Sequence, residues 1–262
     1  MGGREAEVST YNLEAVVIRS RPLVEADSLI TLFSREIGKV RAAARGARKP
    51  RSRLAGGVQP FIHGRYHLWK SRSLDGIRQV EVLTSFSALR GDLDLMCHAG
   101  HMCSLTDAFT TDGDPSEPFF LLLLTSFSLL ENLSPDLARR FFEVRALGVF
   151  GFRPEVESCA ACGGPAGEGQ HRFMASAGGI LCSRCRGQAG SGQPISRQAR
   201  DLLALLQRIH PRRLARLDWP APGSEEMGRL LDGYLSHVLD RPLRTGLLHS
   251  LSGEGPKAPG GI

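Results

Sequence analysis

The first third of the chain carries short runs of β-branched and other apolar residues, several of which alternate with polar residues as β-strands do. Gly, Pro and Ser separate these runs, as expected of turns. Five short strands at this spacing favour a small five-stranded barrel of the OB type. The predicted strands are residues 14–19, 27–33, 38–45, 58–70 and 77–83.

From about residue 87 the apolar positions repeat every three to four residues, which indicates helices. Residues 117–132 are apolar nearly all round, as a buried central helix would be. Strands followed by helices predict an α+β protein. The expected helices are residues 89–109, 117–132, 134–150 (beginning with Ser134 and Pro135), 196–209 and 224–240.

No membrane segment is expected. The longest apolar stretch, residues 119–130, is interrupted by hydroxyl side chains and falls short of the roughly 20 residues that cross a bilayer. The N-terminus lacks the apolar core of a secretory signal. We therefore expect a cytoplasmic protein, and a disordered tail at residues 251–262, where no pattern is visible.

Positive charge is concentrated in one short segment. Between Arg35 and Arg53 there are eight basic residues and one acidic residue, a net of +7, against +6 for the whole chain of 262 residues. A solvated basic loop is the simpler explanation of a charge run. Like charges this dense repel one another, however, and a polyanion would compensate them, so the segment favours an anionic polymer as partner.

Strand alternation places basic residues beside aromatic ones. Odd-numbered residues in 39–45 share one face, and so do those in 61–69. Cations that meet phosphates and rings that stack on bases suit single-stranded nucleic acid. Phe61 and Trp69 could instead pack in the core, and the sequence leaves this open. The candidate nucleic-acid contacts are Lys39, Arg41, Arg45, Arg48, Lys49, Arg51, Arg53, Arg65 and Trp69.

Two Cys-x-x-Cys pairs, Cys159 with Cys162 and Cys182 with Cys185, are separated by 19 residues. This spacing is typical of a zinc ribbon, in which each pair supplies two thiolates to one tetrahedral Zn²⁺. Four thiolates leave no position for water, so one structural ion is predicted; a disulfide or a redox pair is the alternative. A second cluster of Cys and His, at residues 97–103, is expected to pack on a helix.

Signatures of catalysis are weak. Residues 64–71 nearly fit a nucleotide-binding loop, but Trp69 occupies the second glycine position and would block the phosphate cradle. No nucleophile elbow, dinucleotide fingerprint or His-Glu-x-x-His motif occurs. We therefore predict neither a nucleotide cofactor nor an enzyme.

Three stretches resemble one family. They are GKVRAAARGARKPRSRL at residues 38–54, the cysteine pairs CAACGG and LCSRC, and LLDGYLSHVLDRPLRTGLLHSL at residues 230–251. Together they resemble the RecO family of bacterial DNA repair proteins over about residues 10–250. The cysteine pairs are similar to those of the family members that carry zinc. The chain would then comprise an OB-fold DNA-binding domain (1–86), a helical domain (87–155 and 190–250) and an inserted Cys₄ zinc-ribbon-like module (156–189).

The resemblance implies a nucleoid-associated recombination mediator. Such a protein binds single- and double-stranded DNA and anneals complementary strands coated by single-strand-binding protein, whose C-terminal tail it engages. It pairs with RecR and thereby promotes loading of RecA, without hydrolysing ATP. The alternative is a zinc-ribbon RNA- or transcription-associated binding protein without annealing activity, which would leave the helical C-terminal half unexplained.

Overall fold

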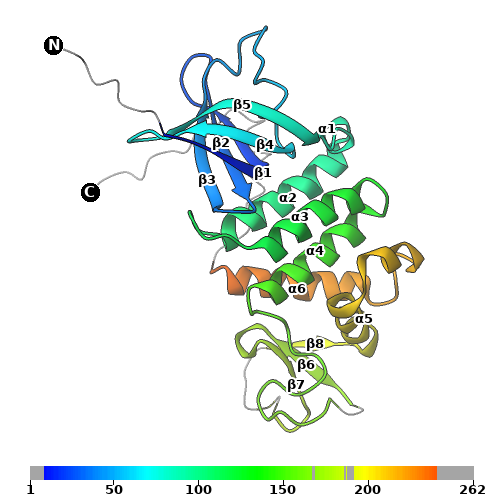
Figure 1. Cartoon of the computed structure of the whole chain (residues 1–262). Coiled ribbons are helices and arrows are strands. Elements are labelled where there is room, and N and C mark those ends of the chain that lie inside the picture. The colour runs from blue at the N-terminus through cyan, green and yellow to red at the C-terminus, as the bar shows by residue number, and fades with distance from the viewer. Residues whose placement is uncertain (1–8, 167–168, 186, 188–191, 241–262) are drawn as a thin grey trace, which may run out of the picture. The chain divides into compact units, whose positions relative to one another are not determined.

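The computed structural model describes residues 9–166, 169–185, 187 and 192–240 (Figure 1). The predicted tail at 251–262 and the end of the C-terminal motif, from Arg241 onward, lie outside these residues. The chain divides into two compact units, and the division falls between Phe120 and Leu121, within helix α3 (Glu117–Leu130). The domain boundary predicted after residue 86 falls between the end of the last barrel strand at Thr84 and the start of the next helix at Ala88, and it stays a prediction.

The first unit contains a closed five-stranded barrel in the order β1-β2-β3-β5-β4, which confirms the predicted OB-type barrel. Strands β3 and β5 pair in parallel, and the other pairs are antiparallel. The predicted strand at 58–70 was too long, because residues 58–62 form turns that lead into β4. The strands are β1 (Thr10–Pro22), β2 (Ser28–Ser34), β3 (Gly38–Ala44), β4 (His63–Trp69) and β5 (Asp75–Thr84).

The side chains on the inward face of each strand fill the barrel. Ala42 and Ala44 of β3 and Tyr66 and Leu68 of β4 are buried in its core, as the pattern predicts. The Tyr66 hydroxyl donates to the Gly57 carbonyl at 3.0 Å, which satisfies its polar end inside the barrel. Phe61 precedes β4 and is only 1% exposed, so of the two possibilities left open for this ring, core packing is confirmed.

Helices α1 (Ala88–Gly91) and α2 (Leu93–Phe109) replace the single helix predicted at 89–109. They are separate because the Asp92 carboxylate accepts from the backbone N–H groups of Asp94 and Leu95 and so caps α2. After α2 the chain passes against β3, where Gly38 has a φ of +70°. A Cβ on Gly38 would lie 2.2 Å from the Asp114 carbonyl oxygen, so only glycine fits.

The second unit holds the remaining helices and a three-stranded sheet in the order β7-β6-β8. Arg140 of α4 is buried and joins α4 to α6, with a nitrogen 2.9 Å from Glu143 and 2.5 Å from Asp232. The elements are α4 (Pro135–Val149), β6 (His171–Met174), the 3₁₀ turn η1 (Ala175–Ala177), β7 (Gly179–Leu181), β8 (Gln193–Ile195), α5 (Arg197–Arg208), η2 (Pro211–Arg216) and α6 (Ser224–Val238).

The helix starts follow the sequence signals to different degrees. Ser196 caps α5 by accepting from the Ala199 N–H at 3.1 Å, whereas Ser134 makes no such bond and α4 begins on Pro135 alone. Among the described residues, no helix combines the length and apolar character that crossing a bilayer requires.

Candidate nucleic-acid interface and metal centre

Arginines lie on the outer surface of strands β1 and β3, which flank β2. The strand register aligns Arg19 of β1 with Thr31 of β2 and Arg41 of β3, so the two arginines lie two strands, or about 10 Å, apart. Arg21 follows Arg19 on the same side of β1, and Arg45 follows Arg41 just beyond β3. We call these four residues, Arg19, Arg21, Arg41 and Arg45, the cationic face.

Lys39 does not belong to this face, although the sequence placed it among the DNA contacts. Its side chain is only 7% exposed, and its ammonium donates to the Asp107 carboxylate at 3.0 Å. It also donates to the backbone carbonyls of Asp107 at 2.9 Å and Thr110 at 2.8 Å. Since a lysine has three N–H donors, none remains for a phosphate. The prediction for Lys39 is corrected: the end of α2 covers this part of β3.

Asp107 bounds the cationic face at that end. Arg19 lies 3.1 Å from its other carboxylate oxygen. Burial opposes ionisation of Asp107, but the hydrogen bond from Lys39 and the charges of Arg19, Lys39 and Arg41 hold its pKa below the ordinary value. Arg41 remains largely open, because its nearest acid, Asp112, is 3.8 Å away and both side chains are more than half exposed.

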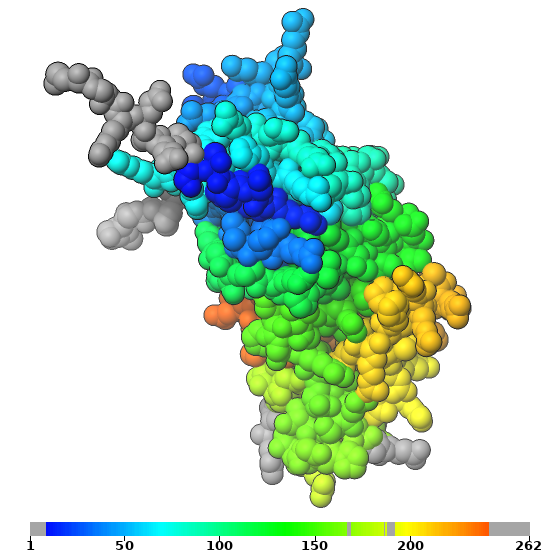
Figure 2. Space-filling model, in the orientation of Figure 1, coloured from blue at the N-terminus to red at the C-terminus, as the bar shows by residue number. Residues whose placement is uncertain are grey.

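The rest of the connection between β3 and β4, residues 46–62, carries four more of the predicted basic contacts, Arg48, Lys49, Arg51 and Arg53, and we call it the cationic loop. Figures 1 and 2 show it projecting from the barrel. Arg48 is anchored, since it donates to the Glu25 carbonyl at 2.9 Å. Lys49, Arg51 and Arg53 are exposed and, within the described part of the chain, form no ion pair. These three side chains are therefore available to a polyanion.

Trp69 lies where the cationic face meets β5. Its ring packs on Gly76, where a Cβ would lie 2.0 Å from the ring. The Arg45 guanidinium is 5.6 Å from the ring centre, a cation–π distance. The indole is half-buried in this arrangement, and its stacking on a base stays a prediction.

Arg65 lies in a different electrostatic environment. It pairs across the sheet with Glu14 and Glu81, and its guanidinium is 3.5 Å from the Glu81 carboxylate. The same surface forms a groove of about 560 Å³ lined by Glu14, Glu36 and Glu81 as well as Arg65. Three carboxylates oppose the approach of phosphates, which sets Arg65 apart from the other predicted contacts.

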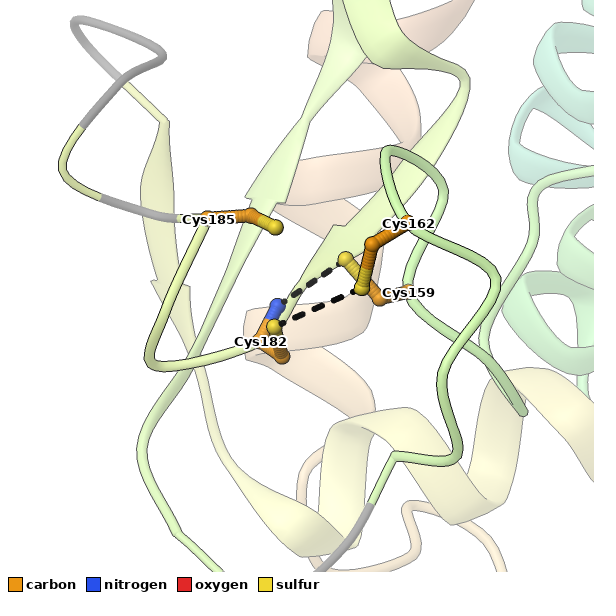
Figure 3. Close-up of side chains that lie close together, drawn as sticks. All are labelled: Cys159, Cys162, Cys182 and Cys185. Carbon is orange, nitrogen blue, oxygen red and sulfur yellow. Dashed lines mark hydrogen bonds between the residues drawn. The ribbon is translucent and has the colours of Figure 1, made fainter.

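The four cysteines gather at one place in the second unit. Cys159 and Cys162 come from the loop before β6, and Cys182 and Cys185 from the loop after β7. Figure 3 shows the sulfurs facing one another, and all four Sγ atoms lie within 4.8 Å. Sulfurs bound at about 2.3 Å to one tetrahedral ion would be about 3.8 Å apart, and the Cys162 and Cys182 sulfurs are 3.9 Å apart. The donor set fits a metal ion.

Backbone N–H groups stabilise the thiolate form of two of the four cysteines. Burial disfavours the Cys159 thiolate, but N–H groups of Cys182, Cys162 and Ala161 point at its sulfur and lower the pKa of Cys159 to about 6. N–H groups of Cys185 and Arg184 lower the pKa of Cys182 in the same way. In the part of the chain that the structure describes, these cysteines are the only metal-ligand cluster.

The cysteine site is attached firmly to its own unit. Phe173 of β6 makes an edge-to-face contact with Tyr234 of α6, with ring centres 5.5 Å apart. The Tyr234 hydroxyl donates to the Phe152 carbonyl at 3.1 Å. His171, which lies between the two cysteine pairs in the sequence, is buried on β6.

Comparison with known proteins agrees with the fold. Residues 8–86 match the family profile described as recombination protein O N terminal, and residues 90–246 match the one described as recombination protein O C terminal. The chain belongs to the RecO family. It is 34% identical to the DNA repair protein RecO of Desulforamulus reducens over 90% of this chain and 92% of that protein. It is 36% identical to the DNA repair protein RecO of Symbiobacterium thermophilum over 91% of this chain and 96% of that protein.

Two arginines of the cationic face, Arg19 and Arg21, were not among the nucleic-acid contacts predicted from the sequence of this RecO family chain. Arg19 was the last residue of the predicted first strand, and Arg21 lay beyond that strand, whereas β1 continues to Pro22. The available signal was the Arg-x-Arg alternation at 19–21, which places both side chains on one side of an extended strand.

Proposed function

We propose that this chain is a recombination mediator in DNA repair that binds single- and double-stranded DNA. It anneals complementary strands coated by single-strand-binding protein and, with RecR, promotes loading of RecA. Family membership supports the class of function. The observation that carries the DNA-binding part is one set of seven exposed cations on the cationic face and cationic loop: Arg21, Arg41, Arg45, Arg48, Lys49, Arg51 and Arg53.

The proposed mechanism is electrostatic. Phosphates of a strand bound along the cationic face displace counterions, so binding weakens steeply as salt rises. A second strand that approaches the same surface meets less repulsion, because the first strand's charge is already compensated. Pairing then proceeds by base complementarity, with no covalent step and no nucleotide hydrolysis, in keeping with a role that is not enzymatic.

The path of the DNA follows from the charges around the barrel. The track includes the cationic face and cationic loop and ends at Asp107, where the α2 terminus covers Lys39. It excludes the groove that holds Arg65, because Glu14, Glu36 and Glu81 line that groove. Trp69 lies beside Arg45 on the track and remains a proposed stacking residue.

For the cysteine site we propose one structural Zn²⁺ held by Cys159, Cys162, Cys182 and Cys185. Four thiolate ligands would fill a tetrahedral ion and leave no position for substrate, so the ion would fasten the two loops and supply no reaction. We further propose a cytoplasmic, nucleoid-associated protein that contacts the C-terminal tail of single-strand-binding protein and RecR.

The test reverses charge on the cationic loop. The variant is Lys49→Glu/Arg51→Glu. Arg48 is left unchanged because its side chain makes a structural hydrogen bond, whereas the side chains of Lys49 and Arg51 make none within the described residues. The matched control is Arg212→Glu/Arg213→Glu, an exposed basic pair on η2 that makes the same change of net charge. We expect the loop variant to bind and anneal oligonucleotides at least tenfold less well, and the control to behave as the wild type. Equal losses in both variants would contradict the assigned surface.

RNA offers a further comparison. Strand annealing that occurs with DNA coated by single-strand-binding protein supports the mediator, whereas binding of RNA or DNA without annealing would favour the zinc-ribbon binding protein.

A further inference from the structure

The turn between β1 and β2, residues 23–27, exposes two aliphatic side chains next to the cationic face and the cationic loop. Leu23 is 43% exposed and Val24 is 65% exposed. Aliphatic side chains gain free energy when an apolar surface covers them, at about 25 cal/mol per Å². Isolated exposed apolar residues are common, so the position of this pair has to carry the argument.

The turn is held in place from inside and from outside. Within it, the Leu23 N–H donates to the Asp27 carbonyl at 3.1 Å, and the Asp27 N–H donates to the Val24 carbonyl at 2.7 Å. From outside, the cationic loop braces it: the Arg48 N–H donates to the Ala26 carbonyl and the Arg48 guanidinium to the Glu25 carbonyl, both at 2.9 Å.

A third brace fixes the base of the turn. The Asp27 carboxylate accepts from the Gly46 N–H at 2.7 Å, which ties the base of the turn to the cationic loop. Figure 1 shows the β1–β2 turn and the cationic loop at the same end of the barrel. The aliphatic pair thus has a fixed position relative to Arg48.

The charges around the turn indicate which kind of ligand could cover Leu23 and Val24. Arg21 precedes the pair along β1, and Arg48 contacts the turn from the cationic loop. Glu25 is the one acid of the turn whose side chain is exposed and forms no ion pair within the described residues. A ligand that covers apolar groups between cations needs apolar faces beside closely spaced negative charges. Unstacked nucleobases on a phosphate backbone have this combination, and bases inside a duplex do not offer their faces.

We propose that Leu23 and Val24 pack on unpaired nucleobases of the strand whose phosphates lie on the cationic face and the cationic loop. This inference rests on the proposed DNA binding and adds a base-contacting site to it. The contact gives the protein an affinity component that is independent of salt and favours single strands and the unpaired side of a gap over continuous duplex.

The test compares Leu23→Ser/Val24→Ser with Leu93→Ser, which changes a 65% exposed apolar residue at the start of α2 in the same unit. Binding to a fluorescein-labelled single strand and to the matching blunt duplex is measured by anisotropy over a range of NaCl. We expect the turn variant to bind the single strand about five- to tenfold more weakly at every salt concentration, with an unchanged slope of log K against log salt. Duplex binding should change less than twofold, and the control should match the wild type.

A single strand that contains 2-aminopurine supplies a second readout, because its fluorescence responds to unstacking. The wild type should raise this fluorescence, and the turn variant should not. Val24→Thr, which keeps the shape of the side chain, serves should the double variant fold poorly. Unchanged single-strand affinity, equal losses on single strand and duplex, or a changed salt slope would each overturn the inference. A wild type that binds neither substrate would instead contradict the proposed function itself.

Discussion

The ammonium of Lys39 donates to the carboxylate of Asp107 across 3.0 Å, and this pair separates two roles for the bases of one strand. Lys39 and Arg41 share a side of β3, yet Lys39 is covered by the end of α2 and Arg41 faces solvent. The lysine stabilises the attachment of the helix to the barrel, and the arginine remains available to a ligand.

Replacing each of these bases by methionine should separate the roles. Lys39→Met leaves the Thr110 carbonyl without its donor and Asp107 without one of its partners, so we expect the free energy of unfolding to fall by about 2–3 kcal/mol. Arg41→Met removes an exposed pair and should cost no more than about 0.5 kcal/mol. Urea unfolding measures both values.

DNA affinity should respond in the opposite order. Measured on folded protein, Arg41→Met should bind a single strand several-fold more weakly, and Lys39→Met should bind as the wild type does. A loss of affinity in Lys39→Met at unchanged stability would mean that the lysine reaches DNA after all.

Ionisation of Asp107 should make the free energy of unfolding depend on pH. Its folded pKa lies below its ordinary value of 3.8, so the ionised carboxylate contributes stability above that pH, and the contribution is lost as the pH falls through the lowered pKa. Asp107→Asn should therefore be less stable than the wild type at pH 7, with a difference that shrinks below about pH 4. Asp112→Asn, on the exposed pair with Arg41, should show little difference at either pH. A constant deficit of Asp107→Asn from pH 7 to pH 3 would contradict the assignment.

Arg21 is a proposed DNA contact that was not predicted from the sequence. Arg21→Gln should weaken binding to a single strand and reduce the slope of log K against log salt by about 0.7, the contribution of one phosphate. The matched change Arg229→Gln, at an exposed position of α6, should leave the slope as it is. Identical slopes for both variants would remove Arg21 from the DNA track.

Metal content tests the cysteine site. Cys182→Ser should bind less than one zinc per chain by elemental analysis and should unfold at lower temperature, because an open coordination site weakens the clasp between the two loops. Cys97→Ser, on helix α2, should retain full zinc content. A stable Cys182→Ser protein with one tightly held ion would refute the ligand assignment.

The parts of the fold that follow from local pattern could be predicted from the sequence. Alternation in β4 set Tyr66 and Leu68 inside the barrel, and the two Cys-x-x-Cys turns each form a local pair whose common chemistry brings them together. Family resemblance joined these parts into one architecture. The OB-type barrel and the helices after it are confirmed by the structure.

Other features depend on contacts that no local pattern contains. Alternation correctly put Lys39 on the outside of β3, but its partner Asp107 lies 68 residues further along the chain. The carboxylates around Arg65 come from three separate segments, so its charge environment could not be inferred from β4 alone. Arg21 was missed for a simpler reason, since β1 extends beyond its β-branched run. Arg19 closes that run, but no second basic residue on the predicted strand marked it as a contact.

The most direct test of the mediator function follows duplex formation between complementary labelled oligonucleotides coated with the cognate single-strand-binding protein, without ATP. The account predicts that the wild type accelerates annealing, that the acceleration fades as salt rises, and that Lys49→Glu/Arg51→Glu loses it while Arg212→Glu/Arg213→Glu keeps it. Tight binding of the wild type to the coated strands with no acceleration of annealing would contradict the account.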